Sequence, residues 1–389
     1  LDRLFGARNT VVTVTSEAAL NAHFAGSALS APLIALMQTG ARWLAQQTGD
    51  AQAAEAYVAG VFAGFLRQMS EQGADFNGFR GFRQRAAEKR RKARFAQSVR
   101  HVHGPEQLDG GPNDIVAIVM VRNAAGYLDA FFDQYRAMGV DHFAFFDNGS
   151  TDDTIARIAS RPGTVVDQCD LPLADYLDLM RAYPAQRYVQ NRWCLNVEVD
   201  EILDFEGRAQ IGIDGLVRYL SEINATAFVA QTLDMFPKTP LSDMGPMTFD
   251  DVLSEFIYFD VSALEHFDYH SPDIPFAPLL AHNDLTVDGI EVFFGGIWRK
   301  VFDESRCLTR HPLVFNGPGV AMTAHPNAPT GVQVGDITGV LRNYRFAGRA
   351  LAQSASAPLF SLDARRWNRV ELLTRAGIVN GSDGYRRFL

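Results

Sequence analysis

The chain has 389 residues, of which 47% are hydrophobic and 21% are charged, and its formal net charge is −9 at pH 7. This composition is typical of a globular protein and argues against a disordered or fibrous chain. The acidic balance argues against nucleic acid as the main partner, because binding to phosphates needs clustered cations. The length suggests two domains, or one large α/β domain with appendages.

The charge is unevenly distributed along the chain. Residues 80–100, which we call the basic arm, contain nine Lys and Arg residues against one acid, so the arm carries +8 and the rest of the chain −17. Three interpretations are open: a solvated helix face, a peripheral contact with an anionic membrane or a lipid-linked acceptor, and RNA binding. The last is the weakest, because aromatic residues for base stacking are sparse in the arm.

Cysteine usage and hydropathy indicate the compartment. The three cysteines (Cys169, Cys194 and Cys307) are widely spaced, which favours a reducing compartment and argues against a disulfide scaffold. No apolar run reaches the roughly 18–20 residues of a transmembrane helix. The chain begins at Leu1 without a segment typical of a signal peptide. We expect a natural N-terminus upstream of Leu1, and a protein that is cytoplasmic or peripheral to the inner membrane.

The first part of the chain has a helical pattern. Residues 18–72 are rich in alanine, and their apolar residues recur at helical spacing, which predicts two or three helices. The basic arm is expected to continue as a helix. Glycine and proline at 104–105 and 110–112 predict a linker. We therefore expect an N-terminal all-helical region over residues 1–110.

An alternation of strands and helices follows. The apolar run IVAIVMV at 115–121 predicts a strand that is buried on both faces, as in a parallel sheet. The next predicted elements are a helix at 126–138, a strand at 142–146, a helix at 153–159, a strand at 164–168, a helix at 184–191 and a strand at 193–199. This order predicts a doubly wound, mostly parallel, Rossmann-like α/β sheet, which binds ligands at the carboxyl ends of its strands.

Two polar clusters follow predicted strands, DNGSTDD at 147–153 and EVDE at 198–201. Glu198 and Asp200 are two residues apart, so on an extended strand they would point to the same side and need a cation between them. Carboxylate oxygens suit Mn²⁺ or Mg²⁺. The alternative is a solvated strand end with incidental acids. In the first cluster, Asp152 is expected to cap the following helix.

Six segments carry a resemblance to a known family: VMVRNAAGYLDAFFDQYRAMGVDHFAFFDNGSTDDT, WCLNVEVDEILDF, TLDMFPKTPLSD, GGIWRKVF, CLTRHPLVF and ITGVLRNYRF. In this order they resemble bacterial glycosyltransferases with the GT-A fold, of the family-2-like type and close to glycosyltransferase family 92. The resemblance covers residues 113–350, which we expect to form the GT-A domain, with a C-terminal helical tail at 351–389.

The resemblance implies metal-dependent transfer of a sugar, with inversion, from a nucleotide-sugar donor to a polysaccharide, lipopolysaccharide or other glycan acceptor. It assigns the metal, Mn²⁺ or Mg²⁺, to Glu198, Asp200 and His325. It assigns the donor to Arg122, Asp147, Gly295, Gly296, Arg299 and Arg345, with Arg310 as a further candidate for the diphosphate.

The catalytic base is less defined. Inversion requires a carboxylate that deprotonates the acceptor hydroxyl, and the leading candidates are Asp234 and Glu291, ahead of Asp288 and Asp336. The chain departs from the family at Asn343, where the family has histidine, which leaves room for a weakened enzyme. Two alternatives stay open: a nucleotidyltransferase that forms sugar nucleotides, and a pseudoenzyme that binds a sugar nucleotide and uses the helical region for interactions.

Overall fold

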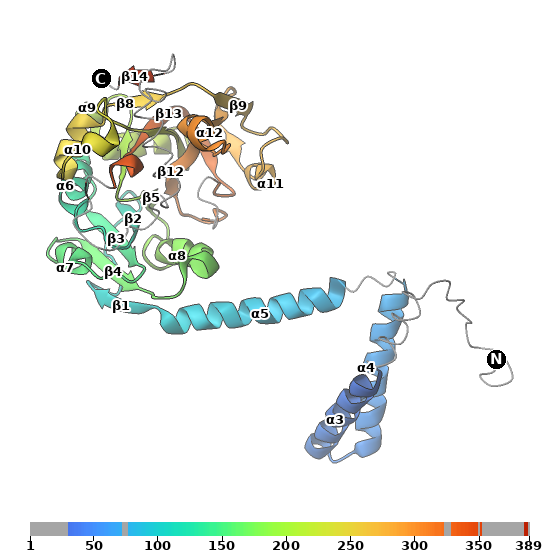
Figure 1. The fold of residues 1–389 in the computed structure, drawn as a ribbon. Coiled ribbons are helices and arrows are strands. Elements are labelled where there is room, and N and C mark those ends of the chain that lie inside the picture. The colour runs from blue at the N-terminus through green and yellow to red at the C-terminus, as the bar shows by residue number, and fades with distance from the viewer. Residues whose placement is uncertain (1–29, 72–76, 323–327, 349–350, 352–384, 388–389) are drawn as a thin grey trace. The chain divides into compact units, whose positions relative to one another are not determined.

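The computed structural model describes residues 30–71, 77–322, 328–348, 351 and 385–387 (Figure 1). The contacts of the chain divide it into two compact units, Leu1–Lys89 and Arg90–Leu389. The boundary falls within helix α5 (Asn77–Ser98), which begins in the first unit and ends in the second.

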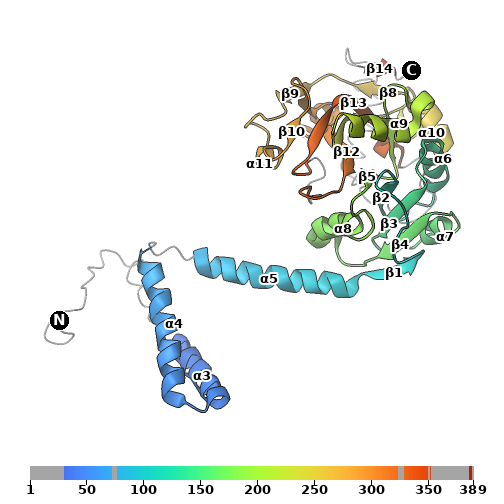
Figure 2. The same ribbon diagram turned by 180° about the vertical axis from the view of Figure 1, so that it is seen from behind.

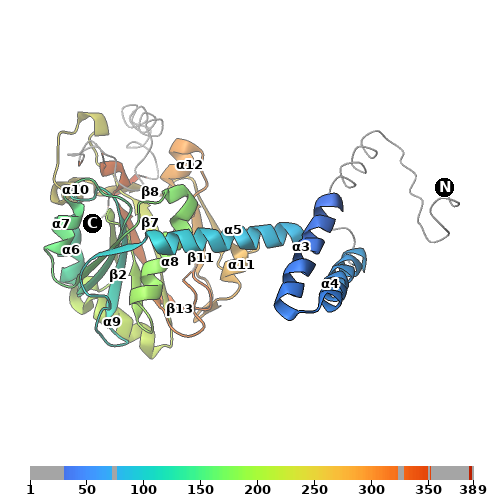
Figure 3. The ribbon, with the colours of Figure 1, turned by 90° about the horizontal axis from the view of Figure 1, so that it is seen from below.

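The first unit contains two helices that pack side by side, α3 (Ser30–Thr48) and α4 (Ala51–Glu71) (Figure 3). Gly49 lies between them with φ of +74°, a backbone conformation that glycine adopts without a steric cost. The buried residues Ala41 and Ala54 are small, which lets the two helices approach closely. The prediction of helices in residues 18–72 is confirmed for the described part of this segment.

The second unit is built around a ten-stranded mixed sheet. In spatial order its strands are β1 (Arg100–His103), β4 (Thr164–Gln168), β3 (His142–Asp147), β2 (Ile115–Val121), β5 (Trp193–Asn196), β12 (Thr309–Phe315), β7 (Ala227–Asp234), β13 (Gln333–Asn343) and β10 (Asp284–Leu285), while β6 (Glu201–Asp204) pairs with β13. The order changes direction at β2, because β3 and β4 lie on one side of it and β5 on the other.

Strand direction brings several strand ends to one edge. Strands β4, β3, β2 and β5 are mutually parallel, and β7 is parallel to β13. Because β12 is antiparallel to both β5 and β7, these two strands run in the same direction. The carboxyl ends of β2, β3, β4, β5, β7 and β13 therefore lie at a single edge, which we call the carboxyl edge.

Helices cover both faces of the sheet (Figure 2). The odd-numbered side chains of β2 pack with α6 (Leu128–Met138) and α9 (Arg208–Glu222). Its even-numbered side chains pack in clusters that include α8 (Leu173–Tyr188). All seven residues of β2 are buried, as the sequence predicts. The unit is thus an α/β fold with a large, mostly parallel mixed sheet, compatible with a Rossmann-like fold.

The remaining elements are short. They are the helices α7 (Thr154–Ala159), α10 (Phe249–Glu255), α11 (Ala277–Leu280) and α12 (Ile297–Phe302), the 3₁₀ helices η1 (Leu241–Asp243) and η2 (Arg345–Ala347), and the strand pairs β9 (Leu264–Asp268) with β11 (Glu291–Gly295) and β8 (Tyr258–Asp260) with β14 (Tyr385–Arg387).

Two predicted elements differ from the structure near the carboxyl edge. The strand expected over 193–199 ends at Asn196, so Glu198 and Asp200 lie in the turn that precedes β6. The helix expected over 184–191 is α8, which begins at Leu173 and contains Pro184 in its interior. Proline favours the first turn of a helix, which explains the expected start, but buried Tyr176 and Met180 anchor α8 to the sheet further upstream.

The boundaries of the expected regions also change. Residues 100–103, which were expected within the helical region, form β1 and pair antiparallel with β4. The tail expected at 351–389 lies outside the described residues apart from Leu351 and β14, which is a strand rather than a helix. Within the described ranges, no helix combines the length and the hydropathy that crossing a membrane requires.

Candidate functional site

Two cavities lie at the carboxyl edge. The loop cavity, with a volume of about 520 Å³, is lined by residues that follow β2, β3 and β4. The acid–arginine cavity, with a volume of about 360 Å³, is lined by residues of α8, β6, β7, β12 and β13 together with the turn at Glu198. Both lie where ligands bind in open α/β sheets.

The loop cavity is bordered by a hydrogen-bonded loop at 147–154. Asp147, the last residue of β3, is fully buried. Its Oδ2 accepts hydrogen bonds from Gly149 N and Ser150 N, both at 3.0 Å, and from Gln168 Nε2 at 2.9 Å, and its Oδ1 accepts one from the Ser150 hydroxyl. A carboxylate with these partners shapes the loop. The geometry therefore favours a structural role for Asp147 over the expected contact with the nucleoside.

The same loop is joined to the segment that follows β2. Asn123 Oδ1 accepts a hydrogen bond from Thr151 N at 2.8 Å, and Ala124 N donates one to Thr154 Oγ1 at 2.7 Å. Asp152 Oδ1 accepts the Thr154 N–H at 3.0 Å, but the N-cap of α7 is Asp153, one residue later than expected, and no side chain caps the helix. These bonds fix two loops against each other and so hold one wall of the loop cavity.

Two arginines supply the positive charge of the loop cavity. Arg122 is half-buried and lines it, as does Arg100 of β1. Arg100 donates hydrogen bonds to Gln168 Oε1 at 2.8 Å and to Asp170 Oδ2 at 2.9 Å. The contact of Arg122 with an anionic ligand stays a prediction, for which the structure supplies a cavity. Arg100 lies before the segment that carries the family resemblance.

The acid–arginine cavity gathers opposite charges from distant parts of the sequence. It is lined by four arginines and three carboxylates of the described residues: Arg181, Arg306, Arg310, Arg345, Glu198, Glu201 and Asp234. Glu198 pairs with Arg345, and Glu201 with Arg310, through short ion pairs. Asp200 approaches the same Arg345 guanidinium at 3.6 Å.

These carboxyl groups have different pKa values. Burial raises the pKa of Asp200 to about 7, with Glu198 and Glu201 acting in the same direction and Arg345 against them. Burial also opposes ionisation of Glu201, yet Arg310 and Arg345 hold its pKa below the ordinary value. Burial opposes the charge of Arg345, but the surrounding acids keep its pKa raised. In the same cluster of charges, the pKa of Asp200 is thus raised and the pKa of Glu201 lowered.

Asp234 differs from Glu198 and Glu201 in that its hydrogen-bond donor is an indole N–H group and not an arginine. It ends β7, is only 7% exposed, and accepts a hydrogen bond from Trp298 Nε1 at 2.9 Å. Burial raises its pKa to about 6, against the influence of Arg345, Arg306 and this hydrogen bond. Arg306 stacks on the Trp298 ring at 3.6 Å from the ring centre. A group with this pKa is suited to accept a proton near neutral pH.

The metal site expected at Glu198, Asp200 and His325 is not seen in the described residues. No group of three or more His, Cys, Asp or Glu side chains in those residues is arranged to hold a metal ion. Arg345 occupies the position between Glu198 and Asp200 where the sequence predicts a cation. His325 lies outside the described residues. As arranged, these side chains do not present a metal site, and we derive no step through a metal.

Several expected site residues lie outside both cavities. Glu291 pairs with His266 at 2.8 Å, and Arg299 pairs with Glu265 at 3.0 Å, all of them partly exposed. Gly295 has φ of +95°, and a Cβ there would lie 2.5 Å from Ala263 O, so backbone geometry accounts for this glycine. Three further candidates are also placed elsewhere: Gly296 precedes α12, Asp288 is exposed, and Asp336 accepts the Tyr219 hydroxyl.

Among the residues that line the acid–arginine cavity, the sequence interpretation missed two arginines and a tryptophan. Arg181 lies on α8, at 3.9 Å from Glu198, and was missed because the predicted helix began at residue 184. Trp298 lies in the short helix α12, and Arg306 lies in the loop that follows this helix. Their spacing follows no pattern that would mark them as site residues.

Comparison with protein-family models and with curated proteins finds no match for this chain.

Proposed function

We propose that the chain is an inverting glycosyltransferase of the GT-A type, which moves a sugar from a nucleotide diphosphate to a polysaccharide, lipopolysaccharide or other glycan acceptor. One observation carries the proposal: four arginines converge beside the buried Asp234 at the carboxyl edge of the sheet. The order of the sequence motifs supports the same activity independently.

The charge of the acid–arginine cavity suits a diphosphate. Four guanidinium groups face three lining carboxylates, and one of these, Asp234, has a pKa of about 6. An incoming phosphate can take over the hydrogen bonds that Arg310 and Arg345 now donate to Glu201 and Glu198, because guanidinium binds phosphate and carboxylate in the same geometry. The nucleoside would occupy the loop cavity, beside Arg122.

The proposed transfer needs one base and one stabilised leaving group. The acceptor hydroxyl oxygen attacks the anomeric carbon while the bond from this carbon to the diphosphate oxygen breaks. Asp234 takes the hydroxyl proton, and the diphosphate leaves with the bonding electrons. The arginines stabilise the negative charge that develops on the leaving group.

A donor panel tests the proposal. The purified full chain is incubated with nucleotide sugars, with Mn²⁺ or with a chelator, and nucleoside diphosphate release is measured. Arg345→Gln and Asp234→Asn are expected to lower release at least about a hundredfold, because each removes a group that acts in the transition state. Arg157→Gln, in an exposed ion pair with Asp129 outside the cavity, is the control and should keep the wild-type rate.

The outcomes separate the alternatives. Saturable donor binding without release would favour the pseudoenzyme. Formation of a sugar nucleotide from a nucleoside triphosphate and a sugar phosphate would favour the nucleotidyltransferase. If no nucleotide sugar is bound or cleaved, the proposal is wrong.

A further inference from the structure

Helix α8 contacts both the acid–arginine cavity and the end of α5. Leu177 and Arg181 line the cavity, one helical turn apart. Asp175 and Asp178 accept hydrogen bonds from Arg91 of α5, whose guanidinium also lies over the Tyr176 ring. Any shift of α8 toward or away from α5 therefore moves Arg181 relative to Glu198, its partner at 3.9 Å.

Arg91 binds the end of α5 to this helix. Its guanidinium donates to Asp178 Oδ1 at 2.7 Å and Oδ2 at 2.5 Å, and to Asp175 O at 2.8 Å. The hydrogen bond from Arg91 is the main reason that the pKa of Asp178 lies below its ordinary value. A paired guanidinium–carboxylate contact fixes direction as well as distance. Arg91 thus holds α8 in one orientation.

Phe95 completes this contact one turn further along α5. It is 6% exposed, and its ring lies 6.1 Å from Phe146, 6.4 Å from Tyr176 and 5.9 Å from Tyr183, measured between ring centres. Aromatic groups at such separations add packing energy beyond their buried area. The contact therefore joins α5, β3 and α8 in one cluster.

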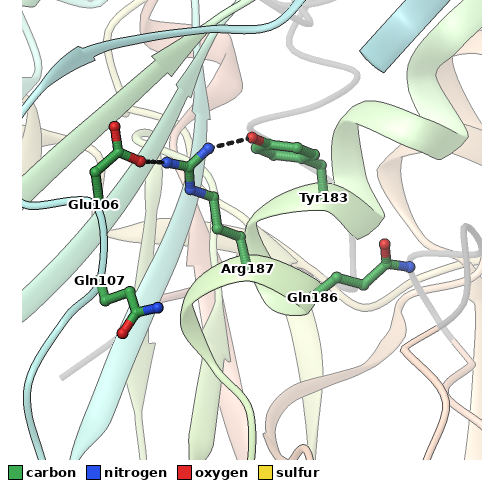
Figure 4. A pocket seen from close by; sticks show the side chains of 5 residues that line it. All are labelled: Glu106, Gln107, Tyr183, Gln186 and Arg187. Carbon is green, nitrogen blue, oxygen red and sulfur yellow. Dashed lines mark hydrogen bonds and ion pairs between the residues drawn. The ribbon is translucent and has the colours of Figure 1, made fainter. Parts of the chain in front are cut away.

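A second set of polar contacts holds the C-terminal end of α8. Arg187 pairs with Glu106 and donates a hydrogen bond to the Tyr183 hydroxyl at 2.6 Å (Figure 4). Tyr188 donates a hydrogen bond to the buried Asp167 at 2.7 Å, and Asp167 is 3.1 Å from His101 of β1. The segment from α5 through β1 to Glu106 thus binds α8 at both ends.

The helix needs such support because of its own sequence. Pro184 lies inside α8 and has no N–H, so the hydrogen bond to residue 180 is missing, and an interior proline weakens or bends a helix. Arg181 lies between the Arg91 contact and Pro184. Its position is therefore set by contacts outside the helix to an unusual degree.

We propose that Arg91 is a positioning residue for the acid–arginine cavity: by holding α8 through Asp178, it sets the place of Arg181 beside Glu198. The basic arm then has two faces with separate roles. Arg91 and Phe95 face the sheet unit, whereas Lys89, Arg90, Lys92 and Arg94 are exposed on the other side of the helix. For its activity readout, this inference depends on the proposed function.

Hydrogen exchange of the full chain tests the positioning without reference to activity. Arg91→Ala should speed amide exchange in residues 173–188 and 197–203, whereas Arg94→Ala, an equal loss of charge on the exposed face, should not. Arg91→Lys keeps the charge but loses the paired contact, and should give an intermediate effect without global unfolding. Equal exchange in the Arg91→Ala and Arg94→Ala proteins would overturn the proposal.

Kinetics provide the readout that a purely structural contact would not change. Arg91→Ala should raise the donor KM about tenfold, a loss of about 1.4 kcal/mol, and leave the acceptor KM unchanged. Combining Arg91→Asp with Asp178→Arg reverses the pair and should restore at least part of the donor KM. An unchanged donor KM, or an equal rise for the acceptor, would contradict the positioning role. If the wild type cleaves no donor, the proposed function fails, and hydrogen exchange still decides the role of Arg91.

Discussion

The two polar clusters at the carboxyl edge differ in what holds their carboxylates. In the 147–154 loop, Asp147 is bonded by neutral donors at most 21 residues away in the sequence. In the acid–arginine cavity, Glu201 and Glu198 are held by arginines 109 and 147 residues away. Neutral backbone donors fix the shape of a loop. Guanidinium groups can exchange one anion for another, so the second cluster is where an anionic ligand can compete.

The largest effect is expected when a buried ion pair of the second cluster is broken. Arg310→Ala leaves the carboxylate of Glu201, which is 1% exposed, without its charged partner. Loss of one member of a buried pair costs about 3–5 kcal/mol, which denaturant unfolding measures. Arg299→Ala, whose pair with Glu265 is well exposed, should cost less than about 1 kcal/mol. If both variants lost the same free energy of unfolding, water or another group would have to compensate the charge of Glu201 in the Arg310→Ala protein.

The next effect concerns the first cluster. Asp147→Ala removes the acceptor of four hydrogen bonds, which come from the N–H groups of Gly149 and Ser150, the Ser150 hydroxyl and the Gln168 side-chain amide. The substitution should lower the free energy of unfolding by about 3 kcal/mol. Asp170→Ala, in an exposed pair with Arg100, should cost less than about 1 kcal/mol. Thermal unfolding of both variants compares them. A small loss for Asp147→Ala, together with weaker nucleotide binding, would restore the ligand role expected from the sequence.

The same comparison explains how much the sequence predicts. The bounds of β2 and β4 follow from local pattern, since a short apolar run between turn residues involves only neighbouring residues. The ion pair of Glu198 with Arg345 depends on how β13 and η2 lie against the turn after β5, which only the tertiary fold determines. The need for a cation between Glu198 and Asp200 was predictable from like charge. That a guanidinium group would lie there was not.

A pH-dependent effect follows from Asp234. Its pKa is raised from 3.8 to about 6 in the folded chain, so between these pH values the folded state keeps a proton that the unfolded state has lost. Through Asp234 alone, the folded chain should therefore lose about 2 kcal/mol of stability as pH rises from 4 to 7, at about 1.4 kcal/mol per pKa unit.

Asp200, with a pKa raised to about 7, adds a slope of the same sign, so the difference between wild type and Asp234→Asn isolates Asp234. Urea unfolding at several pH values measures this difference in stability, with a substitution of an exposed acid, Asp288→Asn, as the control. Parallel curves for wild type and Asp234→Asn would show that Asp234 ionises equally easily in both states.

The smallest effect tests the hydrogen bond from Trp298 to Asp234. This bond favours the ionised carboxylate and so lowers the pKa of Asp234. Trp298→Phe removes the N–H but keeps an aromatic ring beneath Arg306, so the pKa of Asp234 should rise further and the pH at which stability declines should move upward. If Asp234 is the base, the acid limb of the pH–activity profile must also move to higher pH, because activity and stability both depend on the protonation of this carboxyl group. A shift in stability without a shift in activity would separate the buried carboxyl group from the chemistry and leave it a structural part of the second cluster.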